Sequence, residues 1–307
     1  MARILIVTAL ALSLAAAASA RAPGPRCFGA ASSDPLHHCH NSGLDHRVTP
    51  SPADAVLQVD RRPCTPVEGP ARACWFGTPP GQGARTVALV GDSHAEHWRP
   101  ALDRVAAGLH WTIYMVTRSG CHFTRAVPAA PQARDVCLAY NRDALTWLGR
   151  HPEVSAIIAS DHPSGVVRRA GESMMSAWVR GIEEQWAAMP ASVEHVLAIR
   201  DVPFIDAGTL PCVQRAMRSR RNAGRACRIA RNRAVHHDPG PVAARRVGPA
   251  RAAVIDLTGF FCGRRWCPPV IGGVLVYADF FDHITVSYGR TLGPYLLRGI
   301  RRATAAW

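Results

Sequence analysis

The sequence predicts an α/β fold in which helices cover both faces of a mostly parallel β-sheet. Short runs of β-branched and small apolar residues alternate along the chain with longer segments whose apolar residues recur at helical spacing. Strands that alternate with helices in this way form parallel sheets. The length of 307 residues suits one large α/β domain, alone or with an extension, and the sequence shows no internal repeat.

The first 84 residues differ in composition from the rest of the chain. Arg3 precedes an apolar run over residues 4–17, and Ala-Ser-Ala at 18–20 follows as a cleavage site, so residues 1–20 are predicted to be a signal peptide. A retained anchor is the alternative, although the run is shorter than the roughly 18 apolar residues of a membrane span. Residues 21–84 are rich in Pro, Gly, Ser and His and hold four cysteines. They predict a loop-rich, disulfide-stapled extension, which leaves residues 85–307 for the α/β domain.

Five strands and four helices are expected within that domain. The strands are the apolar runs Thr86–Val90, Trp111–Thr117, Val154–Ala159, Val193–Ile199 and Ala253–Leu257. The helices are Glu96–Ala107, Tyr140–Leu148, Glu172–Met189 and Thr285–Thr304. Helical spacing supports the first through Trp98, Leu102 and Val105 and the third through Met175, Trp178, Ile182 and Trp186. The Arg-, Gly- and Pro-rich segment Ala207–Ala250 is expected as an excursion with some helix, and Val274–Tyr277 as a further short apolar run.

Ten cysteines follow the predicted signal peptide. An even number in an exported chain favours disulfides over metal ligation, and no Cys-x-x-Cys spacing points to a metal. Sequence alone does not fix which cysteines pair. Pairing neighbours in order suggests five local bridges: Cys27–Cys39, Cys64–Cys74, Cys121–Cys137, Cys212–Cys227 and Cys262–Cys267.

The chain is strongly basic. The formal net charge is +14, and every one of the 36 basic side chains is arginine. Compositional bias of a GC-rich genome explains such a chain, and attraction to an anionic surface or polymer of the cell envelope is the alternative. The densest basic stretch, Arg215–Arg233, contains no aromatic residue, and the chain is expected to be exported. A nucleic-acid partner is therefore not expected.

Two polar motifs follow apolar runs at opposite ends of the predicted domain. In TVALVGDSHAEHW, Ser93 comes just after a predicted strand, where ligands bind in parallel sheets. In VLVYADFFDHITVSYGRTL, two aspartates and His283 come between an apolar run and a helix. A serine hydroxyl becomes a nucleophile when a histidine takes its proton and a carboxylate orients that histidine. The two motifs together predict such a site. His94 beside the serine and Asp201 after the fourth strand are expected to make structural hydrogen bonds or to contact substrate.

These motifs resemble the SGNH/GDSL hydrolase superfamily. More narrowly, the chain is similar to the exported SGNH domains often fused to membrane acyltransferases that O-acylate envelope polysaccharides. The resemblance covers about Cys27–Leu297 and rests on VALVGDSHAEHWRPAL, VTRSGCHF, CLAYN, RDVPFIDAGTLPC and CPPVIGGVLVYADFFDHITVSYGRTLGPYL. It implies the SGNH hydrolase fold, a flavodoxin-like three-layer sandwich with a mostly parallel sheet.

The resemblance also implies roles for individual residues. The serine of the first block is the family's nucleophile and the histidine of the last block is its base, which match Ser93 and His283. The family's aspartate stands three residues before the histidine, where this chain has Phe280. Asp279 is preferred over Asp282, because adjacent side chains of an extended segment point to opposite faces. Asp282 remains the alternative.

The same family stabilises the oxyanion of a tetrahedral intermediate with preorganised donors. The matching donors here are the backbone N–H groups of Ser93 and Gly120. The family's third donor is often an asparagine after the third strand, and the corresponding AIIASDHPSG contains none. Ser160 is the candidate substitute, and a hole of two donors is the alternative.

The resemblance implies an extracytoplasmic esterase or O-acyltransferase that acts on a carbohydrate O-acyl group, with acetyl favoured. The expected partners are an acylated polysaccharide or a small acyl ester, together with a membrane acyltransferase encoded separately. No cofactor and no metal ion are implied. A catalytically silent module that binds envelope polysaccharide is the alternative, because fold does not dictate function.

Overall fold

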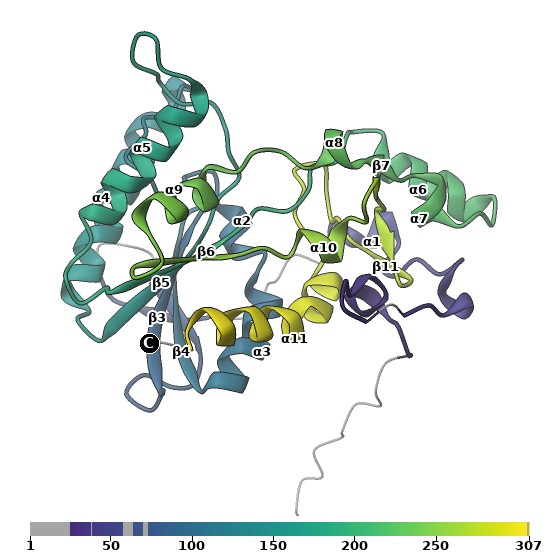
Figure 1. Cartoon of the computed structure of the whole chain (residues 1–307), viewed down its shortest axis with the longest axis horizontal. Helices are drawn as coiled ribbons and strands as arrows, with labels where there is room; N and C mark the ends of the chain where they lie inside the picture. Colours follow the sequence, from purple (N-terminus) through teal and green to yellow (C-terminus); the bar gives the residue numbers. More distant parts are fainter. Residues whose placement is uncertain (1–24, 38, 58–63, 70–72, 306) are drawn as a thin grey trace, which may run out of the picture.

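The computed structural model describes residues 25–37, 39–57, 64–69, 73–305 and 307 of the chain. The predicted signal peptide, residues 1–20, lies outside these ranges. Figure 1 shows a large part built around a twisted sheet and a smaller part beside it. Among the helices of the described ranges, none combines the length and the apolarity that a membrane crossing requires.

A seven-stranded sheet forms the centre of the large part, in the order β1-β2-β4-β3-β5-β6-β8. Its strands are β1 (Thr65–Val67), β2 (Ala73–Gly77), β3 (Arg85–Gly91), β4 (Trp111–Thr117), β5 (Val154–Ser160), β6 (His195–Ile199) and β8 (Ala252–Ile255). The five strands β4, β3, β5, β6 and β8 are parallel, and β1 and β2 lie antiparallel at one edge. Numbered along the chain, the parallel strands follow the flavodoxin-like order 2-1-3-4-5. The expected fold class is confirmed.

Strands β1 and β2 lie where the sequence predicted only a loop-rich extension. β2 pairs with β4 and places Trp75 opposite Tyr114, while Phe76 is buried in the core. Both strands are short and lie among Pro and Gly residues. They therefore lack the apolar runs by which the other strands were predicted. The sheet therefore begins before the boundary that the sequence suggested, and the division of the chain at residue 84 stays a prediction.

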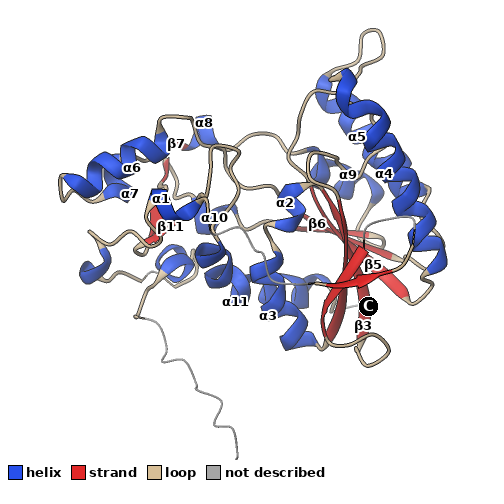
Figure 2. Cartoon of the chain, turned by 180° about the vertical axis from the view of Figure 1, so that it is seen from behind, coloured by secondary structure: helices blue, strands red, loops and turns tan. Residues whose placement is uncertain are grey.

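Helices cover both faces of the sheet (Figures 1 and 2). α3 (Arg99–Leu109) and α11 (Val286–Ala303) pack together on one face. α4 (Pro131–Arg150), α5 (Met174–Ala187) and α9 (Pro239–Val247) cover the other face. α9 lies inside the segment expected as an excursion, so part of that segment belongs to the large part of the molecule.

The alternation of side chains along the strands creates two cores. In β3, Val87 and Leu89 pack toward α3 and α11, whereas Ala88 and Val90 pack toward α4 and α5. Because a central parallel strand is buried on both faces, its sequence is an unbroken apolar run rather than an alternating one. This explains why the apolar runs predicted the strands.

The helix expected at Glu96–Ala107 differs from the observed one. A short helix, α2 (Ser93–Glu96), begins directly after β3, and α3 starts only at Arg99. Pro100 has no N–H to donate to the carbonyl of Glu96, so the α-helical ladder is interrupted between the two helices. The first helical turn therefore starts at Ser93 itself.

The smaller part is built from the N-terminal segment and from the chain between β6 and α11. Its elements are η1 (Gly29–Ser33), η2 (Ser42–Leu44), α1 (Pro52–Ala55), α6 (Thr209–Arg218), α7 (Ala223–Ala226), β7 (Ile229–Ala230), α8 (Arg231–Ala234), α10 (Thr258–Phe261), β9 (Trp266–Cys267), β10 (Val270–Ile271) and β11 (Val274–Leu275). A separate small cluster of buried side chains, among them Val213, Ala216 and Leu275, forms its core. A core of this size supplies little stability by itself.

The ten cysteines form five disulfides, and they join the neighbours that the sequence order suggested. Three of the bridges, Cys27–Cys39, Cys212–Cys227 and Cys262–Cys267, involve segments of the smaller part. A bridge that closes a loop of about 15 residues stabilises a fold by about 3 kcal/mol in the chain-entropy model. The disulfides therefore supplement the small core.

Gly91, the last residue of β3, permits the close approach of β3 and β5 beneath Ser93. Its φ is +130°, and a Cβ there would clash with the carbonyl oxygen of Ser160 on β5. Gly91→Ala is expected to lower the free energy of unfolding by about 2 kcal/mol or more, because backbone must move. Gly81→Ala is the control: Gly81 also has a positive φ, with open space around its Cβ position. It should cost about 1 kcal/mol. Urea denaturation measures both, and equal losses would contradict the proposed steric role.

Candidate active site

Ser93 lies at the carboxyl end of β3, where α2 begins. The Asp92 side chain caps α2, because its Oδ1 accepts a hydrogen bond from the His94 N–H at 2.8 Å. The other oxygen of Asp92 accepts from the N–H of His162, which follows β5, at 3.0 Å. β3 and β5 flank the point where the strand order reverses, the place where parallel sheets bind ligands. The turn that presents Ser93 is therefore tied to both strands.

His283 comes from a tight loop between β11 and α11. An antiparallel bridge joins Tyr277 to Ile284, and the Ala278 N–H donates to the His283 carbonyl at 2.7 Å. Thr285 then caps α11, and its hydroxyl donates to the Leu275 carbonyl at 2.7 Å. The loop over residues 279–283, here called the histidine loop, is thus closed at its base.

Ser93, His283 and Asp279 form one hydrogen-bonded chain. Nε2 of His283 lies 2.8 Å from Oγ of Ser93, and Nδ1 lies 2.7 Å from Oδ2 of Asp279. When Nδ1–H donates to the carboxylate, Nε2 is left as an acceptor for the serine hydroxyl. The side chains of His283 and Asp279 are 25% and 26% exposed to solvent, so these hydrogen-bonded residues lie at an accessible rim of the site.

The two candidate aspartates have different surroundings. Burial acts to raise the pKa of the Asp279 carboxyl, but hydrogen bonds from the His283 ring and from backbone N–H groups, together with the histidine's charge, bring this pKa below its usual value. Asp282 instead accepts from the Ile205 N–H at 2.7 Å, and burial raises its pKa to about 6. Its φ of +66° turns the loop, which accommodates the additional residue before His283. Asp279 is the carboxylate that contacts the histidine.

The three residues considered for the oxyanion hole are not equivalent. Within the described ranges, neither the Ser93 N–H nor the Gly120 N–H donates a hydrogen bond, and both lie in turns after parallel strands. Gly120 has a φ of +76°, which favours glycine. The Ser160 hydroxyl is buried and accepts from Trp98 Nε1 at 3.1 Å. Neither Gly120 nor Ser160 is among the residues that line the cavity beside Ser93, so the buried, bonded hydroxyl is what sets Ser160 apart.

A cavity of about 340 Å³ opens beside the Ser93 hydroxyl. Its polar side consists of Ser93, Glu96, His97, Arg99, Ser119, Asp279 and His283, and its apolar side includes Pro100, Met115, Ile284 and Val286. Glu96 is held in place by the hydroxyls of Thr117 and Ser119, at 3.0 and 3.1 Å. Pockets of this size bind small organic groups, and the polar side chains in their walls fix the orientation of the ligand.

The matched family model is described as "SGNH domain (fused to AT3 domains)", and it covers residues 60–298. The chain belongs to the SGNH domain family. No curated protein sequence gives a significant match to this SGNH domain.

Two solved structures are similar to the SGNH domain in fold. The periplasmic domain of a lipopolysaccharide acetyltransferase from Salmonella ser. Paratyphi A has a TM-score of 0.54 at 12% identity, over 73% of this chain and 85% of that one. A carbohydrate esterase family 2 enzyme with a carbohydrate-binding domain, from Corynascus thermopiles (Myceliophthora fergusii), has a TM-score of 0.39 at 16% identity, over 76% of this chain and 69% of that one. At 12% identity, the similarity to the lipopolysaccharide acetyltransferase domain shows a shared fold and nothing more.

His94, next to the nucleophile candidate, connects three parts of the SGNH domain. Its Nδ1 lies 2.6 Å from Oδ1 of Asp201, which follows β6, and its Nε2 lies 2.8 Å from the carbonyl oxygen of Phe281 in the histidine loop. Both partners are acceptors, so both ring nitrogens must carry hydrogen, and the ring is an imidazolium. Burial acts to lower the pKa of His94, but the charge and hydrogen bond of Asp201 raise it to about 9.

Asp201 is the ionised carboxylate that balances the charge of the His94 imidazolium. Its carboxylate also accepts from the Val202 N–H at 2.8 Å and lies 3.3 Å from Nδ1 of His162. Burial acts to raise the pKa of Asp201, but the His94 charge brings it well below the usual value. The ligand atoms of His94, His162 and Asp201 lie within 4.8 Å of one another, a spacing that a metal ion could use. Because both nitrogens of His94 are already engaged, the trio serves as a hydrogen-bonded cluster rather than a metal site.

His97 completes the wall of the cavity behind His283. Its ring lies 6.2 Å from the His283 ring, and within the described ranges its two buried nitrogens have no hydrogen-bond partner. Burial and the neighbouring charge of His94 lower its pKa well below the usual value. His97 is therefore neutral and does not compete with His283 for a proton from serine.

Sequence reasoning identified the two motifs that meet but missed what joins them. His94 and Asp201 were expected to make structural hydrogen bonds or substrate contacts, and the structure shows the first of these. The link from His94 to Phe281, 187 positions away, was not expected. The sequence signal that could have indicated this link is a histidine, His94, directly after Ser93 at the end of a buried strand.

His94→Gln is expected to reduce the free energy of unfolding at pH 6 and to lose that deficit toward pH 9.5. The folded state keeps the His94 proton up to about pH 9, whereas an unfolded histidine releases it near 6.5. Between these values the folded state binds more protons, so its stabilisation is complete below about pH 6.5 and fades as pH rises. Urea denaturation of both proteins across this range measures the difference. A difference independent of pH would contradict the imidazolium assignment.

Proposed function

We propose that this SGNH domain is an extracytoplasmic serine enzyme that removes or transfers an acyl group, favouring acetyl, on a carbohydrate. The observation that carries the proposal is the chain of two short hydrogen bonds from Ser93 through His283 to Asp279. These contacts provide a nucleophile, a base and a group that orients the base. Membership in the SGNH family and the fold shared with an acetyltransferase domain support the same chemistry.

In the proposed mechanism the Ser93 oxygen attacks the carbonyl carbon of the ester while Nε2 of His283 takes the hydroxyl proton. Asp279 stabilises the imidazolium that results. The oxyanion of the tetrahedral intermediate accepts hydrogen bonds from the backbone N–H groups of Ser93 and Gly120, without a third donor from Ser160. The intermediate collapses to an acyl-serine, and the leaving sugar oxygen receives the proton from His283.

The second half of the reaction decides between hydrolysis and transfer. Water or a sugar hydroxyl gives its proton to His283 and attacks the acyl-serine, which releases either the free acid or a new sugar ester. The family description, an SGNH domain fused to AT3 domains, favours transfer in concert with a membrane acyltransferase. The five disulfides favour an oxidising, extracytoplasmic location.

The wild-type protein is expected to react with a fluorophosphonate probe, whereas Ser93→Ala should not. The probe modifies a serine whose hydroxyl is activated by a base. Ser119→Ala, which removes another hydroxyl of the same cavity, is the matched control and should still be labelled. Gel fluorescence or intact mass measures labelling. If wild type is not labelled, the silent polysaccharide-binding module becomes the better description.

Asp279→Asn is expected to lower kcat on an aryl acetate by about 10³-fold or more, because an amide no longer fixes the histidine tautomer. Asp282→Asn should have a much smaller effect, since Asp282 contacts the Ile205 N–H instead of the histidine ring. Steady-state kinetics of the two variants separates them. A larger loss in Asp282→Asn would show that Asp279 is not the aspartate of the triad.

A further inference from the structure

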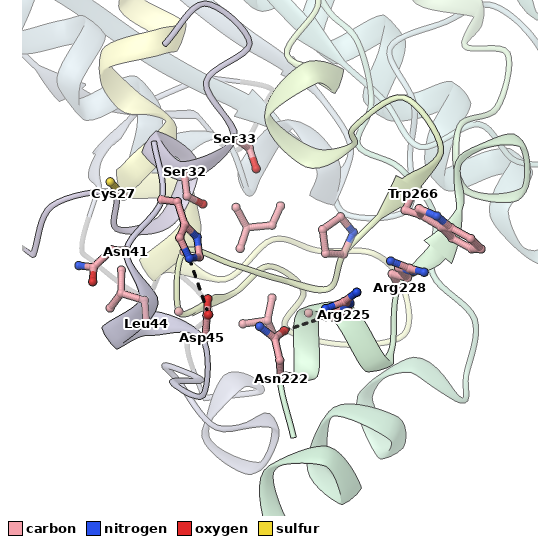
Figure 3. Close-up of a pocket in the computed structure, with 17 residues that line it drawn as sticks. Cys27, Ser32, Ser33, Asn41, Leu44, Asp45, Asn222, Arg225, Arg228 and Trp266 are labelled. Atoms are coloured by element: carbon pink, nitrogen blue, oxygen red, sulfur yellow. Dashed lines mark hydrogen bonds and ion pairs between the residues drawn. The ribbon is translucent and has the colours of Figure 1, made fainter. Parts of the chain in front are cut away.

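A second cavity, of about 430 Å³, lies within the smaller part of the molecule, between its N-terminal segment and residues 222–273. Figure 3 shows Arg225, Arg228 and Trp266 on one side of it, and Ser32 and Asn41 on the other. Its floor is the β10–β11 hairpin with the apolar side chains of Val270 and Ile271. None of these residues takes part in the proposed ester chemistry.

The charged groups of this cavity are unbalanced. The only acidic residue in its wall, Asp45, lies 3.8 Å from Nε2 of His40. Among the residues that the structure describes, no carboxylate lies within ion-pair distance of the Arg225 or Arg228 guanidinium. Arg228 lies over the Trp266 ring, 4.4 Å from its centroid, and this stacking limits the motion of its long side chain. Two guanidinium groups without acidic partners favour an anionic ligand.

The remaining lining favours a sugar over a bare anion. Hydroxyls of Ser32 and Ser33 and the amides of Asn41 and Asn222 surround an apolar floor. The Asn41 amide is engaged by backbone groups of Arg26 and Gly43, and the Ser32 hydroxyl donates to the Gly29 carbonyl. The Ser33 hydroxyl and the Asn222 NH2 group, whose Oδ1 caps α7, are the donors that face a ligand. Such a mixture matches a sugar ring, which has hydroxyls on its rim and C–H groups on its faces. The volume is within the range of sites that bind small organic molecules.

The walls of the cavity are held rigidly. The Cys27–Cys39 bridge closes the loop that carries Ser32, and the Cys212–Cys227 bridge ends between Arg225 and Arg228. The Cys262–Cys267 bridge is next to Trp266. Gly272 in the hairpin turn has no room for a Cβ against the backbone of Cys27 and Gly29. Rigid walls reduce the entropy that a ligand must overcome on binding.

A short stretch of the chain links the wall of this cavity to the candidate active site. Gly273 lines the cavity, and Asp279 follows only six residues later along the chain. Six residues span at most about 22 Å even when fully extended. One oligosaccharide chain is long enough to reach both places.

The geometry points to a binding site for an acidic saccharide, in which Arg225 and Arg228 bind the carboxylate of a uronate unit. A polysaccharide held there would present a neighbouring acylated unit to Ser93. That catalytic consequence rests on the proposed function, whereas the binding itself does not.

Isothermal titration calorimetry at low salt tests the site, with trigalacturonate as the probe. Wild type and Ser93→Ala are expected to bind it equally, so the binding result is independent of whether Ser93 is a nucleophile. The double variant Arg225→Ala/Arg228→Ala should bind about tenfold more weakly or worse. Arg215→Ala/Arg218→Ala is the matched control, because it removes the same charge from exposed residues of α6 outside the cavity and should bind like wild type.

Three outcomes would overturn the inference. They are the absence of saturable trigalacturonate binding to wild type, equal weakening in the two arginine double variants, and equal affinity for neutral maltotriose. Tighter binding of glucose 6-phosphate than of trigalacturonate would overturn the carboxylate assignment. Thermal unfolding of each variant shows whether its fold is intact, and the single variant Arg228→Gln replaces the double variant if that one does not fold.

Discussion

The candidate site depends on the buried pair of His94 and Asp201. His94 follows the nucleophile candidate directly, Asp201 follows β6, and the Phe281 carbonyl belongs to the histidine loop. A buried cation is costly unless acceptors surround it, and here each ring nitrogen has one. The pair therefore fastens the loop that carries Asp279 and His283 to the end of β3. The packing of α3 on α11 already holds the two segments near each other, and the pair adds the hydrogen bonds that fix the histidine loop against the end of β3.

The large part of the molecule holds the extensive cores, and the smaller part contains the proposed binding cavity. The twisted sheet buries two extensive apolar cores and provides a rigid edge for Ser93. The smaller part has only a minor core and is reinforced by three disulfides. Because the β10–β11 hairpin leads directly into the histidine loop, the smaller part also supports one wall of the site. A disulfide-reinforced surface beside an α/β edge suits the proposed action on a long polysaccharide.

Several features were accessible from the sequence because they depend on local chemistry. The central strands are buried on both faces and so appear as apolar runs, and the cysteines, 5 to 16 residues apart in a chain that is expected to be exported, form local bridges. The short strand β2 was not accessible, and α9 was expected only as some helix within an excursion, because Gly, Pro and Arg mask their pattern. Pairing with β1 and β4 stabilises β2, and packing on α5, β6 and β8 stabilises α9.

The sequence by itself determined which chemical groups are present and at which strand ends they stand. A serine after one strand and a histidine with two aspartates before the last helix sufficed to predict the reaction class. Only the tertiary structure decided which aspartate contacts the histidine, since a φ of +66° at Asp282 directs that side chain to Ile205. It alone also decided that His94 is a cation, because the charge of a buried ring depends on acceptors that arrive from distant parts of the chain.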